Sequence, residues 1–317
     1  MRALTIKTGH QRGVAIITAL LIVAIAVTIS VKISTSLQLD VRRTSNMITL
    51  DQARLYSLAA ESWAMRILKD DIKNSTIDSL DENWAIELPP IPIEGGSILS
   101  KLTDLSACLN INALIDPTGK VDTVLQARLQ RLFSNAGVKG TPEQAIKDWL
   151  DADLQTTNPD GAEDGYYLNL TPPYRVANRP MESISELRLV KGFEDPKIYH
   201  QIIQDVCAYP VTGQANTINI NTASKEVLKS LAVNLTDQIA DDIIQQRETD
   251  PFTTLAQFTS FNQLKTIITN TSGLSFSSEN FLLRTQAVIG PANLVVYSVI
   301  HRDTNGIEVV SRSNRVY

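Results

Sequence analysis

The side chains best suited to chemistry are six carboxylates that crowd into one stretch of the chain. They are Asp148, Asp151, Asp153, Asp160, Glu163 and Asp164, and Asn158, Pro159, Gly161 and Gly165 lie among them. Oxygen ligands on a flexible loop are what Ca²⁺ prefers, and carboxylates this dense repel one another unless a cation is present. The spacing does not match an EF-hand. The pattern alone leaves both a calcium site and a solvated acidic loop open.

No other group of residues indicates catalysis. The chain has three histidines, His10, His200 and His301, and none of them has a metal-ligand partner four residues later. Neither a Gly-x-Ser-x-Gly motif nor a phosphate-binding loop is present. We therefore expect no enzymatic activity.

Residues 218–226 and the two predicted helices around them resemble a helix-hairpin-helix unit. DNA-binding versions hold a phosphate on a glycine-rich turn. Here that turn is 232–236 and contains no glycine, and Asp237, Asp241, Asp242 and Glu248 follow it. The net charge of the 317-residue chain is −5, which also argues against a general nucleic-acid binder. We expect the unit to be a scaffold, with no nucleic-acid partner.

The two cysteines are Cys108 and Cys207. An isolated pair favours a disulfide in an oxidising compartment, and the alternative is two unrelated buried thiols. A bridge would tie the first predicted β region to the helices that follow it.

The N-terminus explains why an oxidising compartment is expected. Residues 1–13 carry Arg2, Lys7, His10 and Arg12 with no acid, and residues 14–31 contain no charge. Eighteen helical residues span roughly 27 Å, close to the hydrocarbon thickness of a membrane. The basic leader would stay cytoplasmic, so the remainder would lie in the periplasm.

The glycine directly before the apolar run resembles a type IV prepilin leader, which is cut between Gly13 and Val14. A plain signal anchor is the alternative. The helical pattern continues without proline or glycine to about residue 71, and its apolar stripe suits packing on a domain. The stripe comprises Leu37, Val41, Met47, Leu50, Leu55, Leu58, Ala59, Trp63 and Leu68. Pilin subunits have this shape. They usually carry Glu at the fifth mature position, where this chain has Thr18.

The rest of the chain reads as a sheet interrupted by helices. We predict strands at 97–104, 107–111, 281–289, 294–302 and 307–316, and mostly helices between the two β regions. The fold class is α+β: a long N-terminal helix on a small antiparallel sheet with a large helical insertion. The predicted segments are the leader 1–13, the helix 14–70, the first β region 71–116, the insertion 117–280 and the C-terminal strands 281–317.

Local segments in the expected order resemble the minor pseudopilin K family of type II secretion systems along nearly the whole chain. They are 148–153, 162–167, 173–180, 185–192 and 218–223. The resemblance implies a subunit that caps the tip of the pseudopilus and helps initiate its assembly for export of folded proteins. A tip subunit of a type IV pilus and a membrane-anchored DNA-uptake protein are the alternatives.

The resemblance also implies cofactors and partners. It favours calcium in the acidic stretch, for which Asp151, Asp153, Glu163 and Asp164 are the preferred ligands and Asp160 a further candidate. The implied partners are I-type and J-type minor pseudopilins, the major pseudopilin, prepilin peptidase and secreted exoproteins. The protein would be a single-pass inner-membrane protein.

Overall fold

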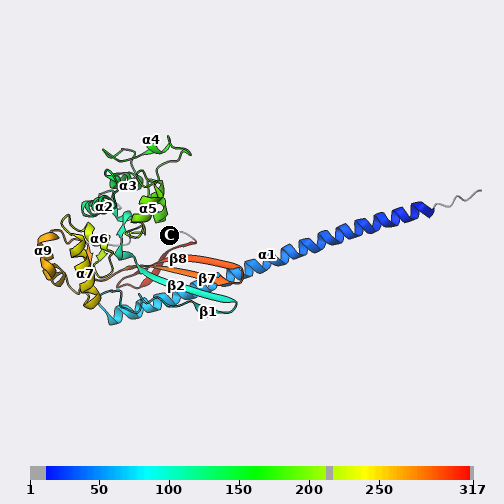
Figure 1. The fold of residues 1–317 in the computed structure, drawn as a ribbon, viewed down its shortest axis with the longest axis horizontal. Helices are drawn as coiled ribbons and strands as arrows, with labels where there is room; N and C mark the ends of the chain where they lie inside the picture. The colour runs from blue at the N-terminus through cyan, green and yellow to red at the C-terminus, as the bar shows by residue number, and fades with distance from the viewer. Residues whose placement is uncertain (1–11, 117, 212–216, 315–317) are drawn as a thin grey trace, which may run out of the picture.

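The computed structural model describes residues 12–116, 118–211 and 217–314 (Figure 1). Most of the predicted leader, residues 1–11, lies outside this range. The first elements are α1 (Arg12–Asn74), β1 (Ile91–Ile93), β2 (Gly96–Asp104), η1 (Leu105–Ala107), β3 (Leu109–Asn110), η2 (Ile111–Leu114), α2 (Thr123–Asn135), α3 (Pro142–Leu150), α4 (Asp164–Tyr167), η3 (Ile184–Leu189) and α5 (Pro196–Ile202). The others are β4 (Val206–Cys207), β5 (Ile218–Asn219), α6 (Lys225–Ser230), α7 (Asp237–Thr249), α8 (Leu255–Ser260), η4 (Phe261–Gln263), α9 (Leu264–Ile267), β6 (Leu274–Ser275), β7 (Asn280–Ile289), β8 (Ala292–Arg302) and β9 (Ile307–Asn314).

Helix α1 is a single rod whose first half projects away from the rest of the molecule (Figure 1). Its N-terminal part is apolar and exposed all round, with a mean hydropathy of 2.9 over the most apolar window of 18 residues. By length and composition it could cross a membrane. The helix passes the predicted end at residue 70 and stops at Asn74, whose side chain donates to the Asp70 carbonyl oxygen.

The face of α1 that packs on the sheet is not the predicted apolar stripe. The buried face consists of Ala53, Ser57, Glu61, Ala64 and Leu68. Of the predicted stripe, only Leu68 is buried. The large side chains on it, from Leu37 to Trp63, are exposed. Ala53, Ser57 and Ala64 on this face are small and let the helix lie close to the strands, and Leu68 fills the space at its C-terminal end. The second half of α1 therefore keeps an exposed apolar stripe.

The sheet has five antiparallel strands in the order β1-β2-β7-β8-β9, and α1 lies along it. Ala53 packs with Ile98 and Ile289, nearer the membrane segment. Ala64 and Leu68 pack with Phe281 and other buried residues at the opposite end of the sheet. The predicted hairpin turn at 303–306 is confirmed, because Asp303 Oδ1 accepts from the backbone N–H groups of Asn305 and Gly306.

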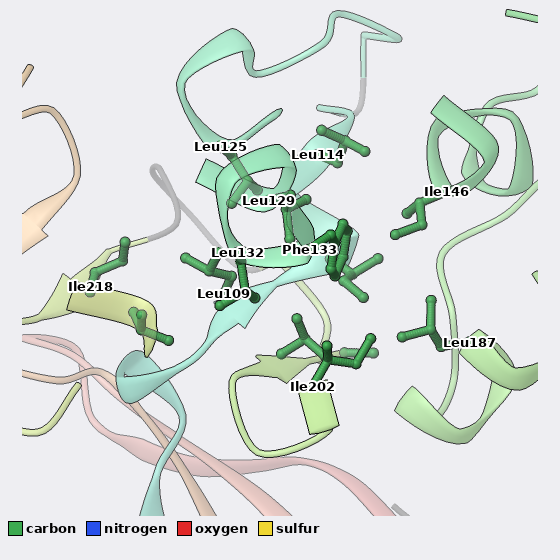
Figure 2. Packing of buried hydrophobic residues seen from close by; sticks show 14 of the residues in the cluster. Leu109, Leu114, Leu125, Leu129, Leu132, Phe133, Ile146, Leu187, Ile202 and Ile218 are labelled. Carbon is green, nitrogen blue, oxygen red and sulfur yellow. The ribbon is translucent and has the colours of Figure 1, made fainter. Parts of the chain in front are cut away.

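The helical insertion leaves the sheet at its membrane-distal end. Asp104, the last residue of β2, pairs with Phe281, near the start of β7, so both ends of the insertion lie side by side. Its apolar core includes Leu109, Leu125, Phe133 and Ile146 (Figure 2). Because Leu109, Ile111 and Leu114 belong to this core, the insertion begins after Asp104 rather than at residue 117.

One predicted strand belongs elsewhere. Residues 107–111 were expected to extend the first β region, but only Leu109–Asn110 forms a strand, which pairs in parallel with Val206–Cys207. This two-stranded sheet lies inside the insertion. As predicted, the described part of the insertion is mostly helical, and Ile184–Leu189 forms a 3₁₀ helix, η3. Asp122, Ser224 and Thr236 cap α2, α6 and α7, because each side chain accepts a hydrogen bond from the first turn.

A buried arginine joins α1 to the far end of the sheet. Arg302, at the end of β8, forms ion pairs with Asp71, at 2.8 Å, and with Asp78. Its Nη1 also donates to the carbonyl oxygen of Leu68, and its guanidinium lies 4.6 Å from the centre of the Phe281 ring. Burial raises the pKa of Asp78 to about 6, although the charge of Arg302 acts in the opposite direction.

A second buried carboxylate ties the insertion to this end of the sheet. Asp104 accepts hydrogen bonds from the hydroxyls of Ser278 and Thr222 and from the N–H of Ser106. Burial raises the pKa of Asp104, and these hydrogen bonds oppose the shift. The Asp104 carboxylate is therefore paired with donors from the insertion and from the segment before β7, as a buried carboxylate requires.

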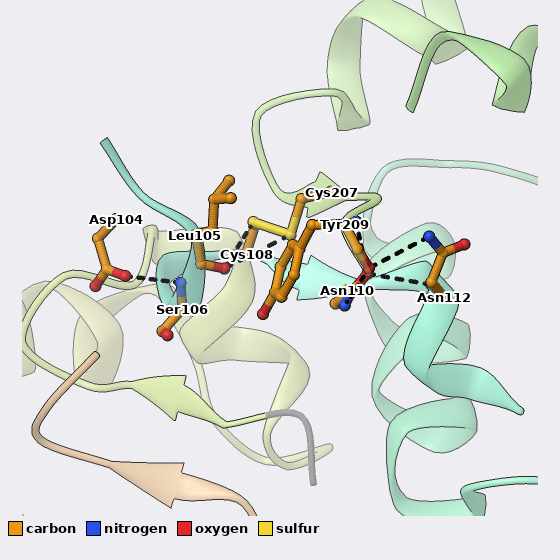
Figure 3. The surroundings of a disulfide bond; sticks show 8 residues. All are labelled: Asp104, Leu105, Ser106, Cys108, Asn110, Asn112, Cys207 and Tyr209. Carbon is orange, nitrogen blue, oxygen red and sulfur yellow. Dashed lines mark hydrogen bonds between the residues drawn. A yellow bond between two sulfur atoms is a disulfide. The ribbon is translucent and has the colours of Figure 1, made fainter. Parts of the chain in front are cut away.

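A disulfide between Cys108 and Cys207 lies close to Asp104 (Figure 3). The two Cα atoms are 5.9 Å apart and 99 residues separate the cysteines in the sequence. Leu105, Tyr209 and Val299 pack around the bridge. Since Val299 lies on β8, the bridge lies where the insertion meets the sheet.

Candidate metal centre

Three of the predicted carboxylates converge between α3 and α4. Asp151 is the C-cap of α3, Asp153 lies in the following loop, and Glu163 immediately precedes α4. One carboxylate oxygen from each lies within 4.8 Å of the other two. This spacing is compatible with ligands that share one cation.

The carboxylates of Asp151 and Glu163 have almost nothing else to bond. Among the described residues, neither oxygen of Glu163, which is 4% exposed, meets a hydrogen-bond donor, and the two buried oxygens of Asp151 meet none apart from the ion-pair contact with Lys147. The nearest positive charge is Lys147 Nζ, 3.3 Å from Asp151 Oδ2. Buried carboxylates without donors are costly, so this site calls for a positive charge.

The pKa values express the same cost. The pKa of Glu163 is raised to about 7. Burial is the main cause, and the negative charges of Asp148, Asp151, Asp153 and Asp164 add to it. Burial also raises the pKa of Asp151, against the opposing effect of Lys147. A bound divalent cation would favour the ionised forms of both carboxylates.

Asp160 and Asp164 are not brought into this cluster. Asp160 Oδ2 accepts from the backbone N–H and the hydroxyl of Thr141, at 2.8 and 2.9 Å. Asp164 accepts from the N–H of Val176 and forms an ion pair with Arg175. Both carboxylates hold the loop to neighbouring segments, as does the fully buried Asp148, which accepts from the N–H of Thr157.

Asn178 is a neighbour of the cluster that sequence reasoning missed. Its Nδ2 donates to the carbonyl oxygen of Asp153, and its Oδ1 is buried with no donor. Its φ is 48°, in the left-handed region that asparagine tolerates better than most residues. No spacing rule connects position 178 with position 153, so only the fold could reveal this amide oxygen. The donor set is oxygen alone, which fits calcium better than zinc.

The two helices predicted for the helix-hairpin-helix-like unit are α6 and α7, and their lysines are already paired. Lys225 contacts Asp237 and Asp241, and Lys229 contacts Glu226 and Asp237. These contacts leave less free positive charge for a nucleic-acid backbone.

A long apolar helix lying on an antiparallel sheet defines the class of membrane-anchored, pilin-like subunits. Family models described as type II secretion system (T2SS), protein K match residues 107–211 and 218–277. The chain belongs to this type II secretion system protein K family, and so is a minor pseudopilin, a structural component of the secretion machinery. The alternatives of a type IV pilus subunit and a DNA-uptake protein are not favoured.

Curated relatives and a solved structure agree. The chain is 32% identical to type II secretion system protein K of Pectobacterium carotovorum, over 96% of both chains. It is 31% identical to the Pseudomonas aeruginosa protein, over 95% of this chain and 92% of that one. The structure of the GspK–GspI–GspJ complex from enterotoxigenic Escherichia coli contains a chain with a TM-score of 0.75 and 28% identity, covering 87% of this chain and all of that one.

Proposed function

We propose that the protein caps the membrane-distal tip of the pseudopilus and helps to start its assembly. The observation that carries this proposal is the position of the insertion, which leaves the sheet at the end farthest from the membrane segment of α1. A bulky body at that end would obstruct the stacking of another subunit above it. Contact with secreted exoproteins would then fall to the same exposed end.

Thr18 supports the same position. Its hydroxyl donates to the carbonyl oxygen of Ala15 within α1, at 3.0 Å, so this side chain is satisfied inside its own helix. In pilin-like subunits, a glutamate at the corresponding position is thought to pair with the N-terminal amine of a neighbouring subunit. An unpaired carboxylate is costly in lipid. A subunit that carries threonine offers no such pairing to a subunit above it.

The exposed apolar stripe of α1 is the surface proposed for lateral partners. Leu37, Val41, Leu55 and Trp63 lie on it, and an exposed apolar surface of this kind marks an interaction site. The I-type and J-type minor pseudopilins are the first partners proposed, by analogy with the GspK–GspI–GspJ complex. The major pseudopilin would pack from below.

Position at the tip can be tested by cross-linking. Cysteine pairs that link adjacent subunits along sheared fibres should capture this protein once, at an end, because the insertion leaves no room above it. Deleting residues 105–279 and joining β2 to β7 by a short turn should let the truncated protein enter the shaft. Thr18→Glu in the full-length chain is the comparison and should not move the protein into the shaft, because the insertion remains and the new carboxylate finds no partner amine. Full-length protein spaced regularly through the shaft would contradict the cap.

Processing and topology form a separate proposal. Prepilin peptidase would cut between Gly13 and Val14, leave α1 in the inner membrane and leave the sheet and insertion in the periplasm. We expect N-terminal sequencing of membrane-extracted protein to begin at Val14. Gly13→Leu should retain the leader, since the glycine directly before the apolar run is the feature that indicates the cut. An intact leader in the unmodified protein would contradict this proposal.

We further propose that Asp151, Asp153 and Glu163 bind calcium, with Asn178 Oδ1 as an added ligand. The support is the convergence of three carboxylates, two of which have no hydrogen-bond donors. The ion would add to the single positive charge of Lys147 beside three carboxylates and would hold the end of α3 against the start of α4.

Chelation should therefore destabilise the protein. A ligand that binds only the folded state adds about 2.7 kcal/mol when its concentration is a hundredfold above Kd. We expect EGTA to lower the Tm of the full-length protein in detergent, and Asp151→Asn to remove the response. Asp303→Asn, in the distant hairpin turn, is the control and should keep it. Equal melting curves with and without chelator would contradict calcium binding and would indicate that the stretch is a solvated acidic loop.

The same site predicts a pH dependence. The folded-state pKa of Glu163 is raised to about 7 without metal. Its contribution to stability is therefore present below the unfolded pKa of about 4.3 and is lost as the pH rises through 7. The calcium-free protein should lose stability between pH 5 and 7, and saturating calcium should reduce this loss. Denaturant unfolding at both pH values measures the difference.

A further inference from the structure

A hollow of about 460 Å³ lies between α2, the α6–α7 turn and the segment after α9. Two arginines of α2, Arg128 and Arg131, line it together with Thr123, Thr266, Thr269 and Asn270. All of these side chains can donate hydrogen bonds. The hollow is well separated in sequence from the acidic cluster, and neither the family nor the proposed function assigns it a role.

The two guanidinium groups have no carboxylate partner. Among the described residues, none of the ion pairs within 4.0 Å involves Arg128 or Arg131. Arg128 is 3% exposed, its Nη2 donates to the Ser272 carbonyl oxygen, and its Nε is buried with no acceptor. Within the described part of the chain, the acceptors of Arg131 are the carbonyl oxygens of Ser230 and Leu231. Two neighbouring cations are thus held by neutral acceptors, an arrangement that costs free energy unless a negative charge joins them.

The surroundings do not supply that negative charge. The carboxylate of Asp122 raises the pKa of Arg128, but its Oδ1 already accepts from the N–H groups of Val124 and Leu125. Burial dominates and lowers the pKa of Arg128 to about 10, which leaves it charged at neutral pH. The first turn of α2, at Thr123 and Val124, also lines the hollow, and the N-terminal end of a helix favours negative charge.

We infer that this hollow, the Arg128–Arg131 pocket, binds an oxyanion, that is, a carboxylate or phosphate group. The planar fork of a guanidinium matches both groups, and the threonine and asparagine side chains can donate to the remaining oxygens. The oxyanion is either free phosphate or the carboxylate of an acidic side chain in a protein segment. The same guanidinium, threonine and asparagine donors would bind either one.

The test uses the full-length protein in detergent and isothermal titration calorimetry at constant ionic strength. One arm adds inorganic phosphate and the other adds N-acetyl-glutamate amide, which presents a single side-chain carboxylate. Saturable binding is expected, and Arg128→Gln should weaken it by about tenfold or more, as the loss of a hydrogen bond to a charged group predicts. Lys197→Gln removes a surface charge elsewhere in the insertion and should have no effect.

Because the buried Arg128 also ties α2 to the Ser272 carbonyl oxygen, a second variant leaves both arginines in place. Ala127 lines the pocket one turn before Arg131. Ala127→Glu would supply an internal carboxylate, so it should abolish binding of either probe and raise the Tm. Ala127→Gln is the neutral control of equal size and should not raise the Tm.

Binding of phosphate alone would identify free phosphate as the source, binding of the glutamate probe alone would identify a protein carboxylate, and both outcomes support the pocket. No saturable binding of either probe would overturn the inference. So would binding that both Arg128→Gln and Ala127→Glu leave unchanged, and the arginines would then be structural clamps only.

Discussion

Replacing Arg302 with methionine is expected to destabilise the full-length protein by about 3–5 kcal/mol at pH 8, because removing one partner of a buried ion pair leaves the other charge uncompensated. Asp78 is 1% exposed and would lose its ion pair. Asp71 and the Leu68 carbonyl oxygen would lose a donor at the same time. Methionine fills similar space, so most of the loss would be electrostatic.

The loss should depend on pH in a defined direction. Burial already raises the pKa of Asp78 to about 6, and without Arg302 nothing as strong opposes that effect. A raised folded-state pKa gives stability that is present at low pH and is lost as the pH rises through that pKa. The deficit of the variant should therefore be smaller at pH 5 than at pH 8, where Asp78 must be buried as an anion.

Urea unfolding at both pH values measures this, with the arginine-containing protein as reference. Lys73→Met is the control, because Lys73 pairs with Asp70 at a site where both side chains are 60% exposed. Such surface pairs contribute at most about 1 kcal/mol. A deficit for Arg302→Met no larger than that of the control would show that the junction does not depend on this ion pair.

Removing the disulfide is the second change with a large expected effect. In the chain-entropy model, a bridge across a loop of about a hundred residues stabilises by up to ~4–5 kcal/mol, and often by less. Cys108 and Cys207 are separated by 99 residues and both are buried. The double variant Cys108→Ser/Cys207→Ser should therefore lose about 2–5 kcal/mol.

The measurement compares unfolding of this double variant with that of the oxidised and reduced parent protein. Reductant should lower the stability of the parent and leave the variant unchanged. Non-reducing mass spectrometry of membrane-extracted protein should find the peptides that contain Cys108 and Cys207 linked. Two free thiols there would mean that the bridge does not form in the cell.

The final hairpin could be predicted because its signal is local: Asp303 closes its own turn. The contact face of α1 could not be predicted in this way. Hydrophobic periodicity weights large side chains, whereas the sheet selected Ala53, Ser57 and Ala64, which allow close approach.

The acidic stretch was predicted as a candidate site, and three of its five candidate ligands, Asp151, Asp153 and Glu163, converge, whereas Asp160 and Asp164 do not. Whether a carboxylate is free or engaged depends on partners distant in the sequence. Thr141 engages Asp160 and Val176 engages Asp164, while Glu163 finds no donor. Asn178 reaches the cluster only because the chain folds back on the loop. Such contacts are non-local and leave no periodic or spacing signal in the sequence.

The placement of the insertion at the end of two neighbouring strands has a mechanical consequence. A compressive force on the insertion, directed along the fibre axis, would be transmitted to β2 and β7 together, because the insertion joins these strands at Asp104 and its partner Phe281. From there, Arg302 bonds the sheet to the last turns of α1 at Leu68 and Asp71. Force applied at the far end is thereby delivered into a helix of 63 residues with no internal break. The molecule can transmit compression toward the membrane as a strut.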